Sequence, residues 1–156
     1  MTQTLSVIKA DIGGMVGHSS MHPDVLDHGR EQIEQAVQNG LLIDGQAHAC
    51  GDDMFLIMSH DRGEDDETLH KFAWDTFQSG TDVARKLHLY GAGQDLLVDA
   101  FSGNIRGAGP GSAELELIER PSEPVIVFMG DKTAAGSFNL HSTKCLPILS
   151  TLLDSL

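Results

Sequence analysis

The stretch of residues 41–87 constrains the fold most, because two strands and a long helix follow one another in it with little chain between them. Residues 41–50 and 54–60 are apolar segments around the tight turn at residues 51–53, which predicts a pair of neighbouring strands. Residues 66–87 then carry apolar side chains at helical spacing. This unit predicts a sheet that packs against an amphipathic helix.

The segments on either side extend this unit into a layered fold. Residues 4–12 are rich in β-branched side chains and predict a strand, and Pro23 suits the first turn of a helix that runs to about residue 39. Residues 113–120 alternate like a half-exposed strand, whereas 124–132 form an unbroken apolar run typical of a central strand. The order β-α-β-β-α-β-β predicts an α/β (α+β) sandwich, with both helices on one face of a largely antiparallel sheet.

The composition excludes several classes of protein. A chain of 156 residues fits one domain with a real core. Its net charge of -13 argues against nucleic acid or an anionic membrane as a partner, because like charges repel. No apolar run is long enough to span a membrane, and the N-terminal residues lack the pattern of a signal peptide, so we expect a cytoplasmic protein. The two cysteines are too few for a disulfide framework.

Carboxylates gather where the predicted strands end. Asp11 closes the first strand, Asp52 and Asp53 occupy the turn between the next two, and Asp131 follows the last. For any one of them, a role in forming the turn is the simpler explanation. The four together favour a hard divalent cation such as Mg²⁺, because carboxylates gathered at one place repel one another unless a cation neutralises them.

Other candidate residues lie in loops. His18 follows Asp11 in a glycine-rich loop, and Gln94 and Asp95 have small neighbours that let the backbone approach a ligand closely. Lys132 is suited to contact a phosphate oxygen, although a solvated strand end explains it as well. The glycine-rich residues 102–111 have the composition of a phosphate cradle, and a turn without a ligand explains them equally well.

The chain resembles the archaeal-type bifunctional fructose-1,6-bisphosphate aldolase/phosphatase family in several blocks that occur in the same order. These blocks are VIKADIGGMVGH, HACGDDMFLIMSH, LYGAGQDLLVDAFSGNIRGAGPG and SEPVIVFMGDKT, followed by FNL. The resemblance implies a gluconeogenic enzyme that joins two triose phosphates and then removes the 1-phosphate to give fructose 6-phosphate. It also implies several Mg²⁺ ions in one site, a homo-oligomer, and a fold that is half of the family's α-β-β-α layers.

The resemblance also assigns roles to particular residues. It implies that the Mg²⁺ ligands are Asp11, His18, Asp52, Asp53, Gln94 and Asp131. It implies contacts to the phosphosugar or triose phosphate from His18, Tyr90, Gly103, Asn104 and Lys132. Asp11 would also be the proton acceptor of the phosphatase step.

Members of this family are more than twice as long as this chain, and this difference leaves two alternatives open. Their Schiff-base lysine and acid/base tyrosine lie in the part without a counterpart here, and Lys86, Lys132 and Lys144 fit that role poorly, so we expect no aldolase step. The first alternative is therefore a truncated, non-catalytic metal-binding fragment. The second is a palm-type nucleotidyl cyclase or polymerase, which shares the GDD turn but has no place for GAGQDLL or GDKT.

The resemblance stops near residue 140, which divides the chain into residues 1–140 and a tail of residues 141–156. One permitted coding of the tail, read in another frame, translates to PLYKMFADPFNTPGLV, which resembles the continuation of the family. We therefore expect that one base was lost near the codon for residue 140 and that the tail is out of frame. Resequencing of the locus tests this expectation, and an out-of-frame tail should be dispensable for the fold.

Overall fold

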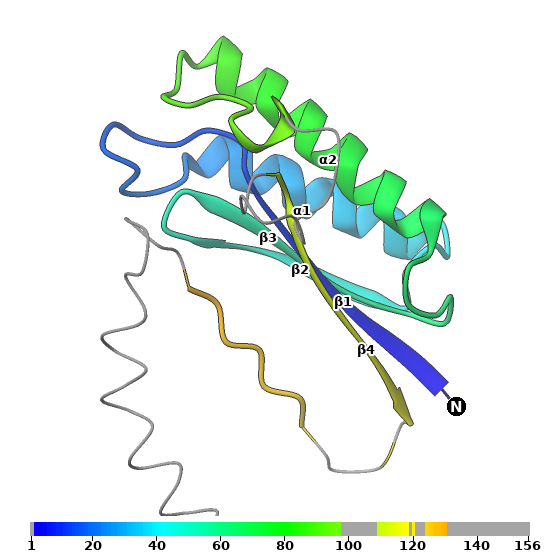
Figure 1. The fold of residues 1–156 in the computed structure, drawn as a ribbon. Helices are drawn as coiled ribbons and strands as arrows, with labels where there is room; N and C mark the ends of the chain where they lie inside the picture. Colours follow the sequence, from blue (N-terminus) through cyan, green and yellow to red (C-terminus); the bar gives the residue numbers. More distant parts are fainter. Residues whose placement is uncertain (1, 98–108, 119, 121–123, 131–156) are drawn as a thin grey trace, which may run out of the picture.

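The computed structural model describes residues 2–97, 109–118, 120 and 124–130, and the fold is stated for these residues. Its elements are β1 (Thr2–Asp11), α1 (Pro23–Gln38), β2 (Asp44–Cys50), β3 (Asp53–His60), α2 (Glu67–Lys86), the short 3₁₀ helix η1 (Asp95–Leu97) and β4 (Gly111–Ile118). The strands form one sheet in the order β2-β3-β1-β4, and every neighbouring pair is antiparallel. Both helices cover the same face of this sheet (Figure 1).

The structure confirms the predicted fold class; three predicted strands shift by one or two residues at their ends, and the start of β2 shifts by three. β2 begins at Asp44 instead of residue 41, because the N–H groups of Leu41 and Leu42 donate to the carbonyl oxygen of Ala36 at 2.9 and 3.2 Å. Gly40 has a φ of 72°, the left-handed conformation that commonly ends a helix. The N–H groups of residues 41 and 42 therefore close the end of α1, and the N–H of Ile43 already bonds the carbonyl oxygen of Ser59 at 2.8 Å.

The central strand predicted for residues 124–132 is wrong over its described part. Residues 124–130 have no regular secondary structure, and Val125, Ile126 and Phe128 are 51%, 71% and 91% exposed. An apolar run becomes a central strand only where strands are present to bond it on both sides, because its N–H and C=O groups need partners. The described strand neighbours leave no such place, since β4 pairs with β1 and residues 124–130 pair with neither edge of the sheet.

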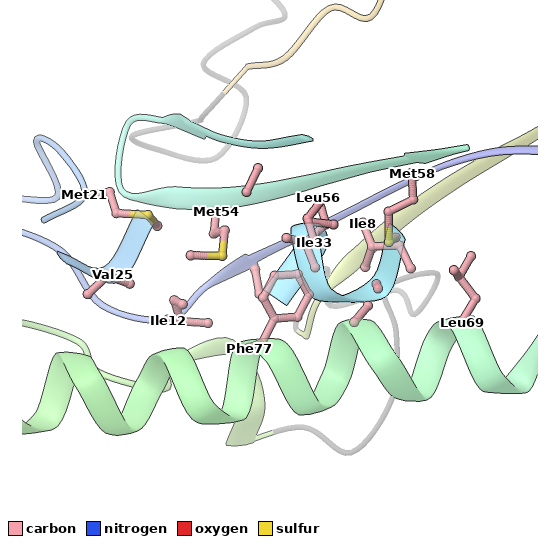
Figure 2. Close-up of a cluster of buried hydrophobic side chains, with 14 of the residues drawn as sticks. Ile8, Ile12, Met21, Val25, Ile33, Met54, Leu56, Met58, Leu69 and Phe77 are labelled. Atoms are coloured by element: carbon pink, nitrogen blue, oxygen red, sulfur yellow. The ribbon is translucent and has the colours of Figure 1, made fainter. Parts of the chain in front are cut away.

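The core fills the layer between the sheet and the two helices. Phe77 of α2 is fully buried and lies opposite Ile8 and Leu56 on the sheet, as Figure 2 shows. The largest buried apolar side chains are Ile8, Ile12, Val25, Ile33, Met54, Leu56, Met58, Leu69 and Phe77. Alternate residues of β1 and β3 supply the sheet side of this core, as the period of two in a strand requires. In the described part of the chain, no helix is long and apolar enough to cross a membrane.

A polar network fastens β4 to the rest of the domain. The carboxylate of Glu114 accepts hydrogen bonds from Ser6 Oγ at 2.6 Å, His70 Nε2 at 3.1 Å and the N–H of Asp65 at 2.7 Å. The fully buried His60 bonds Ser6 in turn, with its Nε2 2.8 Å from the hydroxyl. These bonds join β4 to β1, β3 and the start of α2. They give the side chains of His70 and Glu114, which together with Asp65 form a group of metal-ligand type, a structural role.

Candidate metal centre

The pairing of β1 with β3 brings the predicted carboxylates together at one end of the sheet. Asp11 is the last residue of β1, and in the antiparallel register it lies directly opposite Asp53, the first residue of β3. Asp52 precedes Asp53 in the tight turn between β2 and β3. Asp11 is 7% exposed and the other two are 3% exposed. Three buried carboxylates therefore meet where two strands end.

His18 reaches this cluster from the loop between β1 and α1. Its Nδ1 lies 2.6 Å from Asp52 Oδ2 and 3.7 Å from Asp11 Oδ2. Ligand atoms of Asp11, His18 and Asp52 all lie within 4.8 Å of one another. Carboxylate oxygens with one imidazole nitrogen suit Mg²⁺ or Mn²⁺, so the donor set fits a divalent cation.

Gly14 allows the loop that carries His18 to pass close to the acids. A Cβ at this position would lie 2.4 Å from Asp52 Cβ and 2.9 Å from the carbonyl oxygen of Ser20, so only glycine fits without movement. The backbone of Gly14 also exchanges two hydrogen bonds of 3.0 Å with Tyr90. This bridge holds the loop against the segment that follows α2.

The cluster is electrostatically unbalanced within the described residues. Burial, together with the charges of Asp52, Asp53 and Asp95, raises the pKa of Asp11 from 3.8 to about 7, although the N–H of Gly13 acts in the opposite direction. Asp95 also accepts a hydrogen bond of 2.9 Å from the N–H of Asp11. A bound cation would relieve this repulsion directly.

Tyr90 and Gln94 lie on the solvent side of the same cluster. The ring of Tyr90 meets the His18 imidazole edge to face, with centroids 4.9 Å apart, and Tyr90 is 55% exposed. A Cβ on Gly91 would lie 3.3 Å from Gln94 Oε1 and 3.8 Å from His18 Cε1, which places both side chains around that glycine. Of the other predicted residues, Gly103, Asn104, Asp131 and Lys132 lie outside the described residues.

Two residues that the sequence analysis did not assign to the metal site also belong to this region. The ammonium group of Lys9 donates a hydrogen bond to Asp53, and Asp95 bonds the backbone of Asp11 as described above. The signal for Lys9 was available, because residues two apart in a strand share a face and Lys9 precedes Asp11 by two. Asp95 was a candidate in the glycine-rich loop, but the resemblance assigned it no role in the metal site.

Comparison with known proteins identifies the family. Residues 2–147 match a family model described as fructose-1,6-bisphosphatase. The chain belongs to this family. It is 55% identical over 137 residues to the fructose-1,6-bisphosphate aldolase/phosphatase of Thermococcus kodakarensis, and 56% identical over 137 residues to that of Moorella thermoacetica. A protein of the same name from Pyrobaculum neutrophilum is 52% identical over 141 residues.

These matches confirm the resemblance found in the sequence and show how much of the relatives the chain covers. The aligned regions include 88%, 88% and 90% of this chain but 36%, 35% and 35% of the three relatives, in the order given. The chain therefore spans about a third of the length of the curated relatives that it matches.

Proposed function

We propose that the chain carries the metal-binding part of a Mg²⁺-dependent fructose-1,6-bisphosphate phosphatase, a gluconeogenic enzyme of the cytoplasm. The observation that supports this most is the buried group of Asp11, His18 and Asp52, whose ligand atoms lie within 4.8 Å of one another. The names of the relatives supply the substrate, a phosphosugar. Family membership also argues against the palm-type cyclase alternative, because the match covers residues 2–147.

The chemistry divides between the bound ion and the side chains around it. Bound Mg²⁺ supplies charge for the phosphoryl oxygens and lowers the pKa of a coordinated water. Asp11 is the proton acceptor in this proposal, and Oδ2 is the accepting atom, because Oδ1 already accepts the N–H of Gly13 at 3.2 Å. The pKa of about 7 belongs to the metal-free chain, and a cation bound beside Asp11 would lower it, so that the carboxylate is ionised at neutral pH.

His18 and Tyr90 form the substrate side of the site in this proposal. His18 Nδ1 donates a hydrogen bond to Asp52, so a cation that takes Nδ1 and this carboxylate as ligands has to displace the Nδ1 proton. We therefore expect metal affinity to fall as the pH falls. Tyr90 stands half-exposed against the imidazole and would orient a phosphosugar at the mouth of the site.

A chain that binds metal without turnover is the second candidate. The observation that favours it is the coverage of the relatives, about a third of their length. The proposed Schiff-base chemistry of the aldolase step needs a desolvated lysine, and we propose that this step is absent from the isolated chain. The homo-oligomer implied by the resemblance also remains a proposal.

Calorimetric titration with Mg²⁺ tests the proposed site. The wild-type chain should bind Mg²⁺. Asp52→Asn should lose most of this affinity, because it removes the charge of a buried carboxylate that also holds His18 by a hydrogen bond. Asp75→Asn is the matched control, since Asp75 is an exposed acid on α2 that pairs with Lys71. Unchanged affinity in Asp52→Asn would contradict the site. Release of phosphate from fructose 1,6-bisphosphate then separates the two candidates, because the second predicts binding without release.

A further inference from the structure

Lys9 brings a positive charge to the acid cluster from the solvent side. It lies in β1 two residues before Asp11 and therefore on the same face of the strand. Its ammonium group donates to Asp53 Oδ2. The side chain of Lys9 is 34% exposed, whereas that of Asp53 is 4% exposed. A long side chain with access to solvent thus neutralises a carboxylate that has almost none.

The acids of the cluster consequently fall into two groups. Asp52 is paired with His18, and together with Asp11 they form the group whose ligand atoms lie within 4.8 Å of one another. Asp53 lies directly across the sheet from Asp11, but its Oδ2 is engaged by Lys9. A first cation at the group of Asp11, His18 and Asp52 would use ligand atoms other than the Asp53 oxygen that Lys9 bonds. A second cation at Asp53 has to compete with an ammonium group for the same oxygen.

We propose that Lys9 is a positioning residue that neutralises Asp53 until a second divalent cation replaces it, so that the site fills in a fixed order. This inference rests on the proposed function for the presence of metal. A buried carboxylate without a partner is costly, which explains why Lys9 holds Asp53 in the chain described here. Lysine suits an exchange of this kind, because its flexible stem can withdraw the strongly hydrated ammonium group to water.

The experiment counts ions and measures their affinities in the full chain. Mn²⁺ binding, followed by electron paramagnetic resonance and by calorimetry, is compared between wild type, Lys9→Met and Lys9→Arg. Lys9→Met should raise the affinity for the second ion roughly tenfold or more, where each factor of ten corresponds to about 1.4 kcal/mol. Lys9→Arg keeps the charge and should bind like the wild type. Lys71→Met is the matched control, because it removes a lysine paired with an aspartate on the surface of α2.

The direction of the change decides the inference. If Lys9 only held the Asp53 side chain in the orientation that binds metal, its loss would weaken binding of the second ion. An unchanged or lower affinity for the second ion in Lys9→Met therefore overturns the proposal. If Lys9→Met does not fold, Lys9→Gln keeps a hydrogen-bond donor without the charge and is read in the same way. Failure of both variants to fold also overturns it, since Lys9 would then serve the fold. A wild type that binds no ion contradicts the proposed function itself.

Discussion

Asp11→Asn should stabilise the metal-free chain at neutral and alkaline pH, because the charge of Asp11 is held at a cost. The side chain is buried beside Asp52, Asp53 and Asp95, and burial followed by these charges raises the pKa of Asp11 from 3.8 to about 7. Asparagine keeps an oxygen for the N–H of Gly13, which bonds Asp11 Oδ1 at 3.2 Å, and removes the charge. The substitution therefore relieves repulsion with little change of shape.

The sign and size of the effect follow from linkage between proton binding and folding. The folded chain keeps the Asp11 proton up to about pH 7, whereas the unfolded chain releases it near 3.8. The stability that this proton contributes is complete below the lower value and is lost as the pH rises through the upper one. A shift of about three units at about 1.36 kcal/mol each sets a limit near 4 kcal/mol. We expect Asp11→Asn to gain about 2 to 4 kcal/mol at about pH 8, and little at about pH 4.

Urea denaturation in the presence of a chelator measures this difference. Wild type, Asp11→Asn and the surface control Asp75→Asn are unfolded at about pH 4, pH 6 and pH 8, and their free energies of unfolding are compared. The advantage of Asp11→Asn should grow with pH, whereas Asp75→Asn should follow the wild type, because Asp75 is exposed. Equal stability of wild type and Asp11→Asn at pH 8, or an advantage confined to low pH, would refute the reasoning.

Three further predictions concern the core, the loop and the lysines. Phe77→Ala should lower the free energy of unfolding by about 3 to 5 kcal/mol in urea denaturation, because Phe77 is fully buried between α2 and the sheet. Gly14→Ala should weaken Mg²⁺ binding in calorimetry, since its Cβ would displace Asp52, while Val16→Ala in the same loop, where Val16 is 87% exposed, should not. Borohydride with dihydroxyacetone phosphate should leave no adduct by mass spectrometry, and a stable adduct on any lysine would show that the chain can form the Schiff base.

Most of the fold was predictable because patterns among neighbouring residues indicate most of its helices and strands. The period of two in β1 and β3, the helical spacing in α2 and the tight turn between β2 and β3 each depend on neighbouring residues only. The apolar run at residues 124–132 shows the limit of such patterns. The composition of this run is typical of a central strand, but a central strand needs a neighbouring strand on each side. The residues of the run do not show whether such neighbours are available.

The site was predictable in its acids and less so in the groups around them. The position of Asp11, Asp52 and Asp53 at strand ends suggested a common location from the residues alone. Asp11 lies opposite Asp53 because of the register in which β1 pairs with β3, and the same register brings Lys9 to Asp53. The sequence of either strand alone does not specify this register. The approach of His18 depends on the space that Gly14 leaves beside Asp52, which spacing in the sequence does not reveal.

The repulsion that weakens the metal-free chain and the attraction that would hold a cation are the same interaction. Asp11, Asp52 and Asp53 are buried together at one end of the sheet, so an ion there would bind the folded chain and find no preformed site in the unfolded one. An ion at a hundred times its dissociation constant adds about 2.7 kcal/mol to the stability of the folded state. This gain is similar in size to that expected from Asp11→Asn without metal. Saturating Mg²⁺ should therefore raise the stability of the wild type to that of Asp11→Asn or above it, since the variant has removed both the repulsion and a ligand. For folding alone asparagine at position 11 would serve better than aspartate, and this supports the cation site proposed above.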